Sequence, residues 1–274
     1  MSDVVGVMAR SPEISRRTAS ERAFFGVSAI VFAASAALTL VRWASMSSMD
    51  GMSMPGGWTM SMAWMRMPGQ TLLGASASFL GMWIAMMVAM MLPSLVTMLV
   101  RYRQALDTTG DTPLGLLTAL VAVAYFFVWT VFGLAAFSLG AALTTIEMRQ
   151  PALARVVPIA VGVVILIAGA FQFTAWKACH LDACRVAPGR GRTLPAHAGT
   201  AWRHGLRLGL YCSQCCAGLM SILLVVGVMD LRAMILVAAA ITVERVAPAG
   251  KRVSQVVGAV VVGAGFLLLV RAVG

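Results

Sequence analysis

The segment GMWIAMMVAMMLPS occupies residues 81–94 and contains no charged side chain. It lies within a longer apolar run, residues 71–100, which is long enough to cross the hydrocarbon core of a bilayer as one helix. On such a helix, Met82, Met86 and Met90 recur every fourth residue and form one stripe. Met87 and Met91 form a second stripe beside it, so thioether sulfurs cover a broad face of the predicted helix.

This stripe of methionines has two interpretations. Methionine is flexible and polarizable, so it fills irregular gaps in a protein core. Its thioether sulfur also binds soft ions such as Cu(I). Pro93 follows the stripe and cannot donate a hydrogen bond to the helix ladder, which predicts a kink near the end of the run.

The composition of the whole chain indicates a membrane protein. Of its 274 residues, 60% are hydrophobic and only 11% are charged, and the mean hydropathy is +0.88. A soluble domain of this length could not hide so much apolar surface. The net charge of +11 therefore reflects the placement of basic residues on membrane loops, and we expect no nucleic-acid partner.

The apolar runs predict an all-α, polytopic transmembrane helix bundle with about seven spans, because runs this long and continuous suit helices and not barrel strands. The bundle forms one transmembrane domain, residues 23–270, behind a polar tail at residues 1–22. The run at 233–247 is short, and six spans remain if it is re-entrant. The predicted spans are residues 23–41, 71–100, 114–143, 156–176, 208–228, 233–247 and 253–270.

The distribution of basic residues predicts the orientation. Fifteen of the 21 Lys and Arg residues fall on the side that contains the N-terminus, if each of the seven runs crosses once. Because basic residues accumulate on cytoplasmic loops, the N-terminus is predicted to be cytoplasmic in a multi-pass plasma-membrane protein. Residues 44–70 then form an external loop, and residues 177–207 form a basic cytoplasmic loop.

The external loop contains eight methionines, several of them spaced M-x-M or M-x-x-M. Exposed methionine has no packing role, so this enrichment favours capture of a soft metal ion over drift in a low-complexity loop. Thioethers also resist the oxidative coupling that inactivates thiols outside a cell.

The sequence Cys212-Ser213-Gln214-Cys215-Cys216 lies near the start of the run at 208–228, which the orientation places at the inner face. A C-x-x-C pair in contact with the cytosol is more typical of metal binding or redox chemistry than of a structural disulfide. Cys216 and Met220 are neighbours one turn apart on a helix. Thiolates bind copper tightly and zinc is possible, although three small buried hydrophobic residues would give the same pattern.

Other polar residues give weaker signals. Cys184 follows the run at 156–176, so it can reach the same inner face as the C-x-x-C-C segment. Glu244 and Arg245 are predicted to lie together at the membrane interface. The sequence contains no phosphate-binding glycine loop, nucleophile elbow or zinc-protease motif, which favours binding over catalysis without excluding an enzyme.

Several segments together resemble a bacterial family of unknown function whose members are predicted metal-binding integral membrane proteins. The resemblance covers about residues 71–250, and it implies a metal-binding protein of the bacterial inner membrane. The family pattern K-x-x-C-L-x-x-C-R aligns with Cys184 and Arg185, whereas Cys179 is shifted by one residue. The segments that carry the resemblance are GMWIAMMVAMMLPS (81–94), YFFVWTVFG (125–133), FQFTAWK with CR-x-x-P (171–188), GLYCSQCCAGLM with GVMDLRAM (209–234), and Glu244.

These observations predict a membrane protein that binds a soft metal ion and translocates or delivers it. Cu(I) is the predicted ion, because soft sulfur ligands prefer it. Two alternatives stay open: an accessory or assembly subunit of a membrane metalloenzyme, which would need a membrane-protein partner, and a thiol oxidoreductase that uses Cys212 and Cys215. The predicted metal ligands are Cys212, Cys215, Cys216, Cys184, Met82, Met86, Met90 and Met220.

Overall fold

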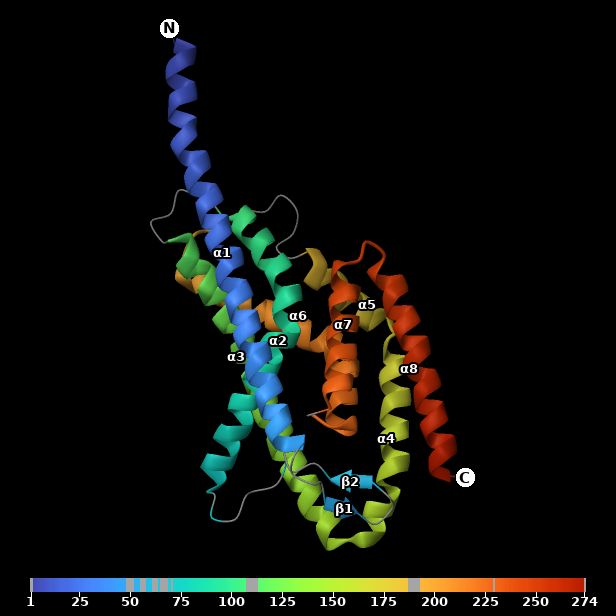
Figure 1. Cartoon of the computed structure of the whole chain (residues 1–274). Helices are drawn as coiled ribbons and strands as arrows, with labels where there is room; N and C mark the ends of the chain where they lie inside the picture. The colour runs from blue at the N-terminus through green and yellow to red at the C-terminus, as the bar shows by residue number, and fades with distance from the viewer. Residues whose placement is uncertain are drawn as a thin grey trace.

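The computed structural model is a helical bundle with one small hairpin, which confirms the all-α prediction (Figure 1). It describes residues 2–47, 52–54, 58–60, 64, 69, 71–106, 113–186, 193–228 and 230–273. The elements in that part of the chain are α1 (Ser2–Ser47), β1 (Met52–Met54), β2 (Trp58–Met60), α2 (Leu72–Ala105), α3 (Leu114–Arg149), α4 (Pro151–Phe171), α5 (Ala175–Val186), α6 (Ala198–Val226), α7 (Leu231–Val246) and α8 (Gly250–Val273).

Six of the described helices are long and apolar enough to cross a membrane. Helix α7, which covers the predicted run at 233–247, is not among them, because its 16 residues extend only about 24 Å. It nevertheless lies in the middle of the bundle, and the chain ends point toward opposite ends of the molecule (Figure 1). The six spans are Thr18–Ser45, Leu72–Ala105, Leu114–Arg149, Ala152–Phe171, Ala198–Val226 and Gly250–Val273.

Helix α2 forms the centre of the bundle. In its most apolar window 61% of the residues are buried, against 6% for α1 and 11% for α8, whose surfaces are therefore left for lipid. The hydroxyl of Thr71 caps the start of α2 by accepting a hydrogen bond from the Gly74 amide at 3.1 Å. The helix continues through Pro93, and α1 is attached near its end, where Arg103 Nη2 donates to Ser20 Oγ at 2.8 Å.

Two segments set the ends of the bundle. At one end, which we call the hairpin end, β1 and β2 pair antiparallel with Met52 opposite Met60 (Figure 1). Trp58 Nε1 ties this hairpin to the start of α4 by donating to the Ala154 carbonyl at 2.8 Å. At the other end, which we call the basic end, the Leu194 amide donates to the Ala105 carbonyl at 2.8 Å, so α6 starts where α2 finishes.

The predicted loops correspond only in part to the structure. Most of the Met-rich segment 44–70 lies outside the described residues, and that prediction rests on sequence alone. The segment 177–207, predicted as a basic loop, contains most of α5 and the first turns of α6. In those turns Ala201 and Gly205 are buried while Arg203 and Arg207 face outward, an amphipathic pattern that hydropathy alone does not reveal.

Close packing joins α6 to α3. A Cβ added at Gly205 would collide with the Val121 carbonyl, and one at Gly209 would lie 3.1 Å from the Tyr125 carbonyl. Glycine at these two positions therefore allows the helix backbones to approach closely. This approach places the Tyr125 side chain beside the cysteines of α6.

Candidate metal centre

The three cysteines of α6 lie together in the interior of the bundle. Cys212, Cys215 and Cys216 are 0–2% exposed, and the Sγ atoms of Cys215 and Cys216 are 3.7 Å apart. Because α6 begins at Ala198, Cys212 lies about 21 Å along the helix. The prediction that these thiols lie at the start of the span is therefore corrected: they occupy the middle of the helix.

A fourth thiol comes from α5. Cys184 is fully buried, and its Sγ lies 3.9 Å from that of Cys215. The hydrogen bond to Cys215, together with burial, raises the pKa of the Cys184 thiol well above its ordinary value. Cys179 lies on the same helix but is exposed, so the structure brings only Cys184 to the other thiols.

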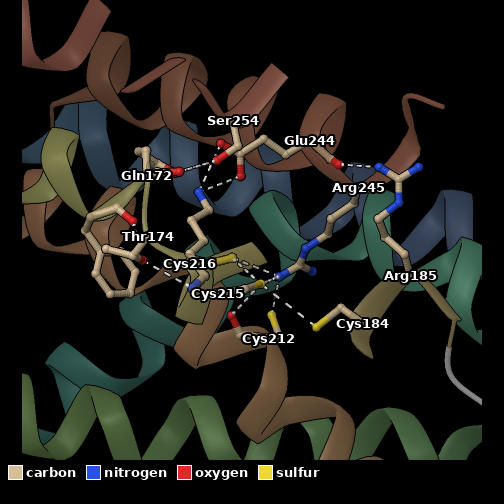
Figure 2. Close-up of polar contacts among 12 residues, drawn as sticks. Gln172, Thr174, Cys184, Arg185, Cys212, Cys215, Cys216, Glu244, Arg245 and Ser254 are labelled. Atoms are coloured by element: carbon tan, nitrogen blue, oxygen red, sulfur yellow. Dashed lines mark hydrogen bonds and ion pairs between the residues drawn. The ribbon is translucent and has the colours of Figure 1, made fainter. Parts of the chain in front are cut away.

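Arg245 of α7 reaches into the thiol group (Figure 2). Its Nη2 atom donates to Cys212 Sγ at 2.7 Å, to Cys216 Sγ at 2.8 Å and to Cys215 Sγ at 3.4 Å. Its Nη1 atom donates to Ser94 Oγ of α2 at 3.0 Å. The guanidinium thus occupies the point that the three sulfurs share, and a positive charge there favours their thiolate forms.

An ion pair holds α5 against α7. Lys177 Nζ bonds both carboxylate oxygens of Glu244, at 2.8 and 3.1 Å, and both side chains are almost completely buried. Arg185 strengthens the attachment by donating to the Glu244 carbonyl at 3.0 Å (Figure 2). It also donates to the Pro248 carbonyl at 3.2 Å. Glu244 and Arg245, which the sequence predicts at the membrane interface, are both buried against partners from other helices, and their depth in a membrane stays a prediction.

Helix α3 supplies a further polar contact. The hydroxyl of Tyr125 lies 2.7 Å from Cys212 Sγ, and the Tyr125 ring is fully buried. Sequence reasoning identified the cysteines but missed Tyr125, Ser94, Lys177 and the inward position of Arg245. One sequence signal could have indicated the inward position of Arg245: Glu244 and Arg245 lie within a short apolar run. Ionisable groups inside a membrane usually face the bundle interior.

The predicted methionine ligands are all in the same hydrophobic core as the four buried cysteines. Met86 is fully buried, and Met82, Met90 and Met220 are at most 8% exposed. None of these side chains is therefore turned toward lipid. Among the described residues, no group of three or more His, Cys, Asp or Glu side chains is already arranged to hold a metal ion.

Comparison with known proteins adds one finding. Residues 80–268 match the model of a family named PpoB2, whose description is copper chaperone. No curated protein and no solved structure matches the chain. The matched region begins just before the methionine stripe of α2 and includes α3 to α7 and most of α8, so it contains every residue of the thiol group and its surroundings. The chain therefore belongs to the PpoB2 copper chaperone family.

Proposed function

We propose that this protein binds Cu(I) at the thiols of Cys212, Cys215 and Cys216, with Cys184 as an additional ligand, and delivers the ion to a recipient. The observation that carries the proposal is the burial of four thiols from two helices in one place. Cysteine sulfur is a soft ligand that selects Cu(I) over harder ions such as Mg²⁺ or Ca²⁺. The family match to copper chaperones supports copper as the cargo.

The positions of the methionines suggest a route to this site. Ser94 lies at the level of the thiols, because it bonds Arg245. Met90 is one helical turn from Ser94 on the same face of α2, and Met86 and Met82 follow at one-turn intervals toward the hairpin end. The thioethers of α2 therefore form a line from the Met-rich hairpin end to the thiol group.

The other helices show the same order. Helix α6 runs from the basic end toward the hairpin end, so Met220 lies one turn beyond Cys216 on the hairpin side. Helix α7 runs in the opposite direction to α8, and Met234 in its first turn lies on the hairpin side of Arg245 (Figure 1). In our proposal the neutral thioethers bind the ion weakly and pass it on, because passage requires sites that bind without trapping. The thiols bind it more tightly and retain it.

The alternative function as a thiol oxidoreductase receives limited support. Cys184 and Cys215 are the cross-helix pair whose sulfurs lie 3.9 Å apart, which differs from the Cys212 and Cys215 pair suggested by the sequence. Catalytic cysteines are partly exposed so that a substrate thiol can reach them. Both members of this pair are buried, which disfavours direct attack on them by a substrate thiol.

The test is elemental analysis of the full-length protein, purified after loading with Cu(I) under reducing conditions. We expect the Cys212/Cys215/Cys216→Ser variant to lose nearly all bound copper. Cys179→Ser is the matched control, because this cysteine is exposed whereas the other four are buried, and it should retain the wild-type copper content. Equal copper in the triple variant and the wild type would refute the proposal.

A further inference from the structure

Arg245 presents an electrostatic problem. Its side chain is buried, and its hydrogen-bond partners in the described structure are three sulfurs and one hydroxyl group. The adjacent carboxylate of Glu244 is engaged by Lys177, so these two charges neutralise each other. An arginine cannot lose its proton in a protein, and an isolated buried cation is very costly. Arg245 therefore needs a negative charge at the thiol group.

A bare copper ion is a poor neighbour for this guanidinium, because two positive charges repel strongly in a dry interior. The balance changes when the ion is bound by thiolates. One Cu(I) ion with two thiolates carries a net charge of minus one, and burying such a complex requires a positive partner. Arg245 supplies one positive charge in contact with the sulfurs that would form it.

We infer that Arg245 is the counter-cation of an anionic Cu(I) complex in which two of the three cysteines Cys212, Cys215 and Cys216 bind the ion as thiolates. The inference rests on the proposed function, and it specifies the charge of the complex that the site accepts. It makes Arg245 a positioning residue: the guanidinium balances the single negative charge of the complex.

The contacts of Arg245 indicate how its guanidinium can stay beside the thiols both with and without bound copper. Nη2 lies 2.7 and 2.8 Å from the sulfurs of Cys212 and Cys216, and metal–thiolate bonds are about 2.3 Å long for an ion such as zinc. An ion shared by these sulfurs needs the space of Nη2, so the guanidinium has to withdraw when copper binds. Nη1 is bonded to Ser94, which keeps the group beside the sulfurs as it withdraws. The buried Nε atom has no hydrogen-bond partner in the part of the chain that the structure describes, so it is available as a donor to the complex.

The test is the Cu(I) affinity of the full-length protein in lipid nanodiscs. It is measured by competition with a chelator that becomes coloured when it binds Cu(I). Arg245→Met should weaken binding by about ten-fold or more, because it leaves a buried negative charge without a partner. Arg245→Lys keeps the charge and should recover most of the affinity. Arg232→Met is the matched control, because Arg232 is an exposed cation on the same helix, and it should bind copper like the wild type.

The possible outcomes separate the two proposals. Loss of affinity in Arg245→Met with recovery in Arg245→Lys supports the counter-cation. Wild-type or tighter binding by Arg245→Met overturns it, as does equal loss in both variants, since charge would then not be the property that matters. In either of these cases, loss of copper from the triple cysteine variant still supports the proposed function, whereas retention of copper there refutes both.

Discussion

The thioether line of α2 and the thiol group of α6 are both buried and rich in sulfur, but their surroundings differ. Met82, Met86 and Met90 share one hydrophobic core with the thiols, but their thioether side chains are uncharged. The thiols contact a guanidinium and a tyrosine hydroxyl, and an ion pair lies beside them. Neutral sulfur needs no charge partner in a membrane, whereas thiolates do. In the proposed function, charge and not sulfur content therefore distinguishes the thiols that retain the ion from the thioethers that pass it on.

The largest effect on stability should come from breaking the Lys177–Glu244 ion pair beside the thiol group. Lys177→Met leaves Glu244 buried without a partner and should destabilise the protein by about 3–5 kcal/mol. The double variant Lys177→Met/Glu244→Gln should recover much of this loss, because neither charge remains. Thermal unfolding in detergent measures both. A double variant no more stable than the single one would show that the pair does not act as a unit.

An intermediate effect is expected from the cysteine that joins α5 to the centre. Cys184→Ser should weaken Cu(I) binding by about ten-fold, roughly 1.4 kcal/mol, because it removes a soft sulfur but leaves the three thiols of α6. The same chelator competition measures this affinity. Cys179→Ser serves as the control on the same helix, and an equal effect of both substitutions would contradict a role for Cys184 as ligand.

The smallest effect on bound copper should come from the thioether line. Met86→Leu/Met90→Leu conserves volume, so stability should change by less than about 1.5 kcal/mol per site. The copper content at equilibrium should stay at the wild-type level, while the rate of loading from the hairpin end should fall. Stopped-flow loading of protein in sealed vesicles measures that rate. Unchanged loading would assign these methionines to packing alone.

Much of the fold could be predicted from the chain because a bilayer imposes simple requirements. Long apolar runs must become helices. Six of the seven predicted runs, all except 233–247, correspond to the six apolar spans of the described structure. The run at 233–247 was harder to interpret, because its length is marginal and its buried face carries charges. Helix α5 was missed because its charged residues, including Lys177 and Asp182, are typical of a loop.

The site was predictable only where its chemistry is local. The C-x-x-C-C segment of α6 and the methionine stripe of α2 are patterns within single helices, and both stand out in the sequence. Arg245 contacts thiols that are 29 to 33 residues away in the sequence, and it bonds Ser94, which is 151 residues away. No helical periodicity contains information on such pairings, because they depend on which helices become neighbours.

The sequence by itself determined which sulfurs are available and that they lie on apolar helices, since hydropathy and spacing are properties of consecutive residues. Tertiary structure decided that Cys184, Tyr125, Ser94 and Arg245 meet the thiols of α6. The physical reason is that charged and polar groups in a low-dielectric interior are stable only with partners, and here those partners come from different helices.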